Sequence, residues 1–125
     1  MNNYEVEKKT LGINDFTIKF DYIISDVKFI DGTYVVLLDI PVGIDEIDNV
    51  YGVASDGIII WRVENPIKAF ELNEGTQGFE YYAKSIYVDI SLDDKNNLSG
   101  TTFLGMKYII DYKTGKLLEE SYIRW

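Results

Sequence analysis

The segment FIDGTYVVLLDI, residues 29–40, decides the predicted fold. Two stretches rich in apolar residues, 27–30 and 33–40, flank the dipeptide Asp31-Gly32. A two-residue Asp-Gly connection between such stretches is typical of a tight β-hairpin, because the turn needs residues that tolerate positive φ angles. The segment therefore predicts two antiparallel strands joined at this turn.

Alternation of apolar and polar residues continues outward from this hairpin in both directions, as is typical of half-buried strands. It predicts further strands at 16–22, 50–54, 58–63, 84–92, 106–112 and 116–122. In 84–92 the apolar residues fall on one face, so Tyr87 on the other face is expected to be exposed. The Gly-Thr-Thr sequence at 100–102 is expected to form a bend between strands.

Two segments lack this alternation. Residues 41–49, PVGIDEIDN, are expected to form a connecting loop. The second segment carries the start and stop signals of a helix, with Asn65 as N-cap, Pro66 at the first helical position and Gly75 after the end. A short helix is therefore predicted over 66–74.

Together these elements predict an all-β protein with one short helix. About eight or nine short strands, spaced roughly 8–12 residues apart, favour an antiparallel meander that forms a small sandwich or a partly closed barrel. Parallel crossovers need more helices than the sequence offers. At 125 residues, the chain has the length of a single domain, so residues 1–125 are expected to form one β domain.

The composition excludes most kinds of catalytic and metal site. The chain contains no Cys and no His, so disulfides, thiolate metal sites and histidine-based catalysis are impossible. Paired carboxylates among Asp45, Glu46, Asp48, Glu71 and Glu74 remain as acid–base groups, but their polar surroundings favour solvated acids. We therefore expect a protein that is not an enzyme and holds neither cofactor nor metal. The N-terminal residues contain no apolar stretch of the signal-peptide type, so a cytoplasmic location is expected.

Acidic residues are concentrated in one part of the chain. Residues 29–83 contain ten acidic and two basic residues, and thus eight of the nine net negative charges. Such a field attracts cationic partners and repels nucleic acids and anionic membranes. The predicted partner-binding residues are Asp39, Asp45, Glu46, Asp48, Glu71, Glu74 and Tyr81. An alternative hypothesis is a carbohydrate- or ligand-binding module, because the ten tyrosines include several that are expected to be exposed.

Two segments of similar pattern, 50–63 and 107–120, form predicted hairpins. The residues that carry the pattern are Tyr108, Asp111, Thr114 and Gly115 in one, and Gly57 and Trp61 in the other. They resemble the blade hairpins of quinoprotein-like β-propellers. The resemblance implies a turn that caps its own backbone and places a glycine at positive φ, and it implies no cofactor. Trp61 is expected in the core.

In overall character, as a small acidic β protein without His or Cys, the chain is similar to bacterial immunity proteins, which cover the active site of a cognate toxin. This resemblance implies a basic protein partner such as a nuclease-type toxin, met by the acidic residues with nearby aromatic anchors. The chain itself is expected to be a monomer, or a homodimer formed through unpaired edge strands.

Overall fold

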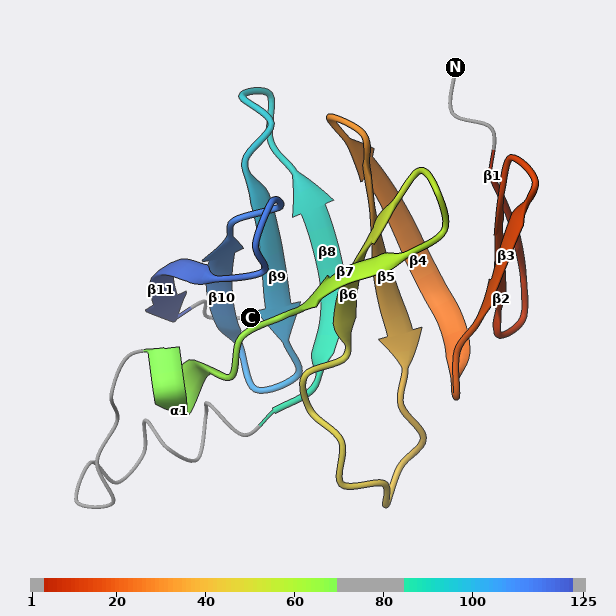
Figure 1. Cartoon of the computed structure of the whole chain (residues 1–125). Coiled ribbons are helices and arrows are strands. Elements are labelled where there is room, and N and C mark those ends of the chain that lie inside the picture. The colour runs from red at the N-terminus through yellow and green to blue at the C-terminus, as the bar shows by residue number, and fades with distance from the viewer. Residues whose placement is uncertain (1–3, 70–84, 123–125) are drawn as a thin grey trace.

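Residues 4–69 and 85–122 are described by the computed structural model of the chain. They form three antiparallel sheets and one short helix, so the all-β prediction is confirmed (Figure 1). None of the three sheets closes into a barrel. The sheets instead pack face to face, as in the predicted sandwich.

The strands follow one another in each sheet as they do along the chain. Sheet A contains β1 (Tyr4–Glu7), β2 (Thr10–Ile13) and β3 (Phe16–Lys19). Sheet B contains β4 (Ile23–Ile30), β5 (Thr33–Asp39), β6 (Val50–Ala54) and β7 (Ile59–Arg62). Sheet C contains β8 (Tyr87–Leu92), β9 (Leu98–Thr102), β10 (Met106–Ile110) and β11 (Leu117–Tyr122). The helix α1 (Pro66–Ala69) follows β7.

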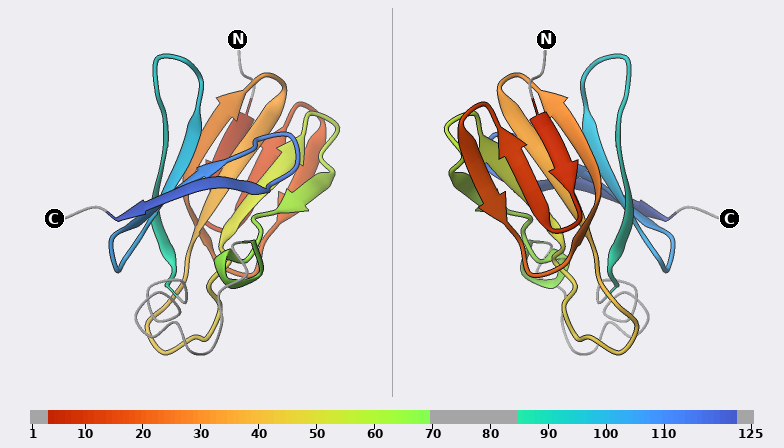
Figure 2. Two further views of the ribbon diagram at one scale, coloured as in Figure 1. Left: turned by 90° about the vertical axis from the view of Figure 1, so that its left-hand side faces the viewer. Right: turned by 90° about the vertical axis from the view of Figure 1, so that its right-hand side faces the viewer.

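Sheet B is the middle layer, with sheet A on one face and sheet C on the other (Figures 1 and 2). Between sheets B and C, Val35 belongs to the same apolar cluster as Tyr108. Between sheets A and B, Val36 belongs to a second cluster with Leu11. Alternate residues of β5 thus enter opposite clusters, and all of residues 33–38 are buried. Burial on both faces explains why this strand is continuously apolar.

The hairpin predicted at Asp31-Gly32 is confirmed. It joins β4 to β5, and its two turn residues have φ angles of 45° and 83°. The last hairpin, β10–β11, has the self-capping turn that the propeller resemblance implies. The carboxylate of Asp111 accepts a hydrogen bond of 2.9 Å from the backbone N–H of Lys113, and Gly115 has φ of 77°.

The expected exposure of Tyr87 is wrong, because β8 contains a β-bulge. Tyr87 pairs with Thr102 while Asp89 pairs with Thr101, so Val88 is an extra residue in the strand. The bulge shifts the alternation by one position. As a result, Tyr87 is buried in the core and Val88 is 43% exposed.

The bend expected at 100–102 is also wrong, since these residues belong to β9, which lies between β8 and β10. All five residues of β9 are buried, but most are small or polar and give no apolar alternation. Their small size has a packing role. A Cβ atom on Gly100 would lie 2.7 Å from two atoms of the Tyr87 ring, so a larger residue would displace that ring.

At the N-terminal end, β1 and β2 were not predicted, and the strand predicted at 16–22 ends at Lys19. Residues 20–22 instead cross from sheet A to sheet B. Phe20 is buried as expected, whereas Phe16 is 47% exposed. This crossing places Phe20, Asp21 and Tyr22 beside residues of sheet B.

The start of the predicted helix is confirmed. The side-chain oxygen of Asn65 accepts a hydrogen bond of 2.9 Å from the N–H of Ile67, and Pro66 is the first residue of α1. The remainder of the predicted helix, 70–74, lies outside the described residues. No helical segment in the described ranges has the length and apolar character of a membrane span.

A buried side-chain amide connects sheets B and C. Asn49 is 1% exposed, and its Nδ2 donates hydrogen bonds to the carbonyl oxygens of Leu38, at 2.8 Å, and Tyr87, at 2.9 Å. Its Oδ1 accepts a hydrogen bond of 2.8 Å from the N–H of Tyr87. One side chain therefore holds the end of β5 against the start of β8.

The indole of Trp61 makes a second connection between the same sheets. Trp61 is 6% exposed, which confirms its predicted place in the core. Its Nε1 donates a hydrogen bond of 2.7 Å to the carbonyl oxygen of Tyr112. The indole lies against Gly52 of β6 and against Gly115 of the β10–β11 turn, and a Cβ atom at either glycine would collide with it. This packing keeps β7 beside the last hairpin.

Replacing Tyr87 with phenylalanine is expected to preserve the fold and to reduce its sensitivity to alkaline pH. Within the described part of the chain, the Tyr87 hydroxyl is buried and has no hydrogen-bond partner. Its removal should therefore leave the free energy of unfolding unchanged or raise it by up to roughly 1 kcal/mol at neutral pH. Urea unfolding at pH 7 measures this difference.

The alkaline effect follows from burial, which raises the pKa of Tyr87 well above 10.0. Above pH 10 the unfolded chain releases this proton and the folded chain keeps it, so stability falls as pH rises. The loss is about 1.4 kcal/mol per pH unit for each tyrosine held protonated. Unfolding curves between pH 9 and pH 11 should show a shallower loss for Y87F than for the unmodified chain. Identical slopes would contradict the burial of this hydroxyl.

Candidate functional site

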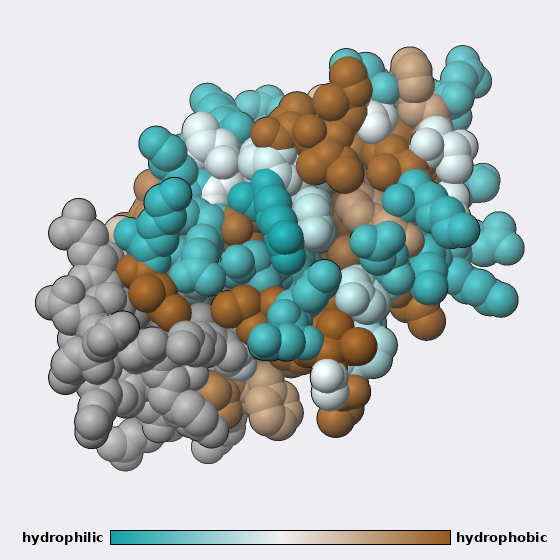
Figure 3. Space-filling view, turned by 60° about the horizontal axis from the view of Figure 1, so that its bottom comes forward, coloured by the Kyte–Doolittle hydropathy of each residue, from teal (hydrophilic) through white to brown (hydrophobic). Residues whose placement is uncertain are grey.

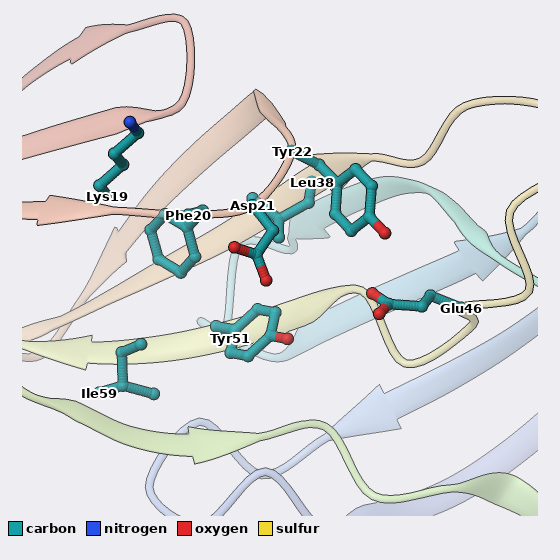
Figure 4. A pocket seen from close by; sticks show the side chains of 8 residues that line it. All are labelled: Lys19, Phe20, Asp21, Tyr22, Leu38, Glu46, Tyr51 and Ile59. Carbon is teal, nitrogen blue, oxygen red and sulfur yellow. The ribbon is translucent and has the colours of Figure 1, made fainter.

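A pocket lies where the chain crosses from sheet A to sheet B (Figure 4). It encloses about 170 Å³. Its lining residues come from the end of β3, the crossing segment, sheet B and the loop after β5: Lys19, Phe20, Asp21, Tyr22, Leu38, Glu46, Tyr51 and Ile59. Figure 4 shows the carboxylates of Asp21 and Glu46 directed toward the space beside Tyr51. We call this site the Tyr51 pocket.

Tyr51 lies at the centre of this site because of its place on β6. It pairs directly with Arg62 of β7, so both side chains lie on the face of sheet B that turns toward sheet A. The Arg62 guanidinium carbon lies 5.4 Å from the centroid of the Tyr51 ring, and the Phe20 centroid lies 5.5 Å from it. The ring is thus held between an aromatic neighbour and a cation.

Several charged side chains act on Tyr51. Burial raises the pKa of Tyr51 first of all, the positive charge of Arg62 lowers it, and the negative charges of Glu46, Asp21 and Asp48 raise it further. Three carboxylates therefore act on one tyrosine, although they come from separate parts of the sequence. Lys19 and Arg62 supply the positive charges nearby, so the pocket combines both signs with an acidic excess.

The structure places the predicted acids in different surroundings. Asp39 is exposed at the end of β5, and Glu46 lines the Tyr51 pocket. Asp45, its neighbour in sequence, lines a second hollow with Ile44 and Phe103. The loop 41–49 therefore directs two adjacent carboxylates into separate hollows.

Asp48 is half-buried and forms hydrogen bonds within the protein. Its backbone carbonyl accepts a hydrogen bond of 2.7 Å from Nε of Arg62, and its carboxylate accepts one of 3.4 Å from the Asn65 amide. Burial raises the pKa of Asp48, and the Asn65 hydrogen bond and Arg62 charge lower it in part. Asp48 thus connects the loop to β7 and to the start of α1.

The other predicted partner-binding residues, Glu71, Glu74 and Tyr81, lie outside the described residues. The sequence prediction missed Asp21, Tyr22 and Tyr51. Asp21 precedes the acidic part of the chain, and the predicted strand 16–22 placed it on an ordinary solvent face. The signal that could have found it is the DY pair at the end of an apolar alternation, where a strand gives way to a connection.

The chemistry of the pocket favours binding of a cation. Among the described residues, no group of three or more acidic side chains has an arrangement that could hold a metal ion. Carboxylates beside a tyrosine are suited to an ammonium or guanidinium group, which gains charge attraction and charge-assisted hydrogen bonds.

A family model described as "Domain of unknown function (DUF7957)" matches residues 1–122. The matched range includes all three sheets and the Tyr51 pocket. No curated protein matches the chain, and no solved structure matches it.

Proposed function

Because the chain belongs to the DUF7957 family, whose description names no function, we propose its role from the site: it binds and masks a basic protein partner. The mode of action is that of a toxin immunity protein, which covers the working surface of a toxin such as a basic nuclease. The acidic residues around Tyr51 meet Lys or Arg side chains of the partner, and the tyrosines are the aromatic anchors.

The observation that carries this proposal is the lack of internal neutralisation. The chain has a net charge of −9, yet the described side chains form a single ion pair, Lys28 with Asp26 at 3.4 Å. The carboxylates of Asp39, Asp45 and Glu46 are exposed and belong to no such pair. They are therefore available to cations of another molecule.

The size of the pocket favours a partner's side chain over a free ligand. Small-molecule sites usually enclose about 300–1,000 Å³, whereas the Tyr51 pocket encloses about 170 Å³. The carbohydrate-binding hypothesis depends on exposed tyrosines, and Tyr87, which was expected to be one of them, is buried. A single Lys or Arg side chain suits both the volume and the charge of the pocket.

The double substitution Asp21→Asn with Glu46→Gln is expected to weaken binding of the basic partner at least about tenfold, which is ~1.4 kcal/mol. It removes two negative charges from the pocket with little change in shape. Candidate partners are the products of neighbouring genes, tested by co-expression and then by calorimetry at two salt concentrations. Binding of the unmodified chain should weaken as salt rises, and that dependence should be smaller in the variant.

The matched control is Asp94→Asn with Glu119→Gln, which removes two exposed charges from sheet C and its turn. We expect its affinity to stay within about twofold of the unmodified chain. Equal losses in both variants would show that only total charge matters and that the pocket has no special role. Failure of every basic candidate to bind would remove the basis of the proposal.

A further inference from the structure

The outer strand β7 presents an unusual row of exposed apolar side chains. It is the last strand of sheet B, and no other strand of the described residues pairs with its outer edge. Beyond Arg62 that edge is covered by the β10–β11 turn, because the carbonyl oxygen of Gly115 accepts a hydrogen bond of 2.9 Å from the N–H of Glu64. Ile58, Ile59 and Ile60 are 59%, 44% and 47% exposed. Figure 3 shows that apolar side chains gather in patches on the molecular surface rather than scattering evenly among polar ones.

A β-bulge is the reason that neighbouring isoleucines are all exposed. Gly52 of β6 pairs with Trp61, and the next residue, Val53, pairs with Ile59. Ile60 is therefore an extra residue without a partner on β6, and the usual alternation of buried and exposed positions is lost. Trp61 is the residue of this strand that enters the core.

Most other outer strands carry charged residues within them, which discourages pairing with another chain. Glu5 lies in β1, Asp26 in β4, Asp89 in β8 and Glu119 in β11. β7 also contains one charged residue, Arg62 at its end, but the three isoleucines and Trp61 before it form an uncharged stretch. The stretch from Ile58 to Trp61 thus remains available to an added strand, a mode of recognition in which backbone hydrogen bonds supply affinity.

The open edge adjoins the Tyr51 pocket. Ile59 lines that pocket together with Tyr51 and Glu46. Because Ile59 pairs with Val53, whose side chain is in the cluster between sheets A and B, Ile59 lies on the pocket side of sheet B. A strand added to β7 would place alternate side chains on this same side, next to Ile59.

We propose that an extended segment of the basic partner adds to sheet B along β7 and inserts a Lys or Arg side chain into the Tyr51 pocket. This inference rests on the proposed function and names the surface and the kind of segment that it uses. The apolar residues of the segment cover Ile58 and Ile60. The aliphatic part of its Lys or Arg side chain crosses Ile59, and the cation reaches the carboxylates of Asp21 and Glu46.

Charge identifies this occupant in preference to a second copy of the chain. Two copies would each bring a net charge of −9, and pairing of one short strand buries little surface to offset that repulsion. A basic segment gains from the same charge. The free chain should therefore sediment as a monomer, and a dimer that Ile60→Glu dissociates would overturn the proposal.

The first test uses three capped nine-residue peptides: alternating Val and Lys, alternating Val and Glu, and Lys alone. The full chain, labelled with ¹⁵N, is titrated with each peptide at low salt. We expect the Val–Lys peptide to bind at least about tenfold more tightly than the other two. It should slow amide hydrogen exchange at residues 58–62 and shift the resonances of Tyr51. Equal binding of oligolysine without protection of 58–62 would overturn strand addition while leaving the acidic surface as a binding site.

The second test separates strand addition from charge. Ile60→Glu and Leu118→Glu each add one negative charge at an exposed position of an outer strand, since Leu118 on β11 is 58% exposed. Ile60→Glu should weaken binding of the Val–Lys peptide at least about tenfold, because it places a charge on the docking edge. Leu118→Glu should leave binding within about twofold. Equal behaviour of the two variants overturns the proposal for β7, whereas failure of both basic peptides to bind counts against the proposed function itself.

Discussion

Replacing Asn49 with aspartate is expected to unfold the domain or to lower its free energy of unfolding by at least about 3 kcal/mol. The Asn49 amide donates hydrogen bonds to the carbonyls of Leu38 and Tyr87 in a fully buried site. A carboxylate of the same shape would hold oxygen against these carbonyl oxygens, and burial would oppose its charge. Thermal and urea unfolding, followed by circular dichroism, measure the loss.

Two further variants make this prediction specific. Asn49→Ala removes the same hydrogen bonds without adding charge, and it should cost roughly 2–4 kcal/mol, since each unsatisfied buried group costs about 1–3 kcal/mol. Asn96→Asp makes the same chemical change in the exposed turn between β8 and β9, where we expect an effect within about 0.5 kcal/mol. If N49D were as stable as N96D, Asn49 could not be the connection between sheets B and C that its hydrogen bonds indicate.

Replacing Gly52 with alanine is expected to lower the free energy of unfolding by about 3 kcal/mol or more. The added methyl group would fall within the indole of Trp61. The indole has little room to move away, because Nε1 is bound to the carbonyl of Tyr112 and the ring also lies against Gly115. Relief of the collision would require separation of β7 from the last hairpin.

Gly12→Ala is the matched control for this prediction. Gly12 lies in β2, and the nearest atoms to an added Cβ would be backbone oxygens at 3.9 and 4.0 Å, which is ordinary contact distance. The control should change stability by less than about 1 kcal/mol. Trp61→Leu in the Gly52→Ala background should restore part of the loss, since a smaller side chain leaves room for the methyl group. Additive effects of the two substitutions would contradict a direct collision.

Local signals sufficed for much of the fold. The Asp-Gly turn at 31–32 and the glycine-containing turns at 55–57 and 113–115 fix hairpins within a few residues. The cap at Asn65 likewise starts α1 where predicted. In each case the residues that specify the structure are adjacent in sequence. Their backbone preferences and hydrogen bonds therefore act without help from the rest of the chain.

Features that depend on distant partners could not be predicted in this way. Nothing near Val88 marks the bulge that buries Tyr87, because its place is set by pairing with β9. β9 itself was missed, since its small residues are selected by the Tyr87 ring that covers Gly100. The Tyr51 pocket likewise unites Asp21, Glu46 and Tyr51 from three segments. Only the stacking of sheet A on sheet B brings these segments together.

The order of the strands bears on how the chain acquires its structure. In each sheet every strand pairs with one that is next to it in sequence. Such pairings close short loops and cost little chain entropy, so the hairpins are expected to form early and independently. The slow step is then the docking of sheet C on sheet B, which requires Asn49 and Trp61 to find their partners across the connection between β7 and β8. Substitutions at these two residues should therefore slow refolding as well as reduce stability. Substitutions within a hairpin turn should instead change the rate at which that hairpin forms.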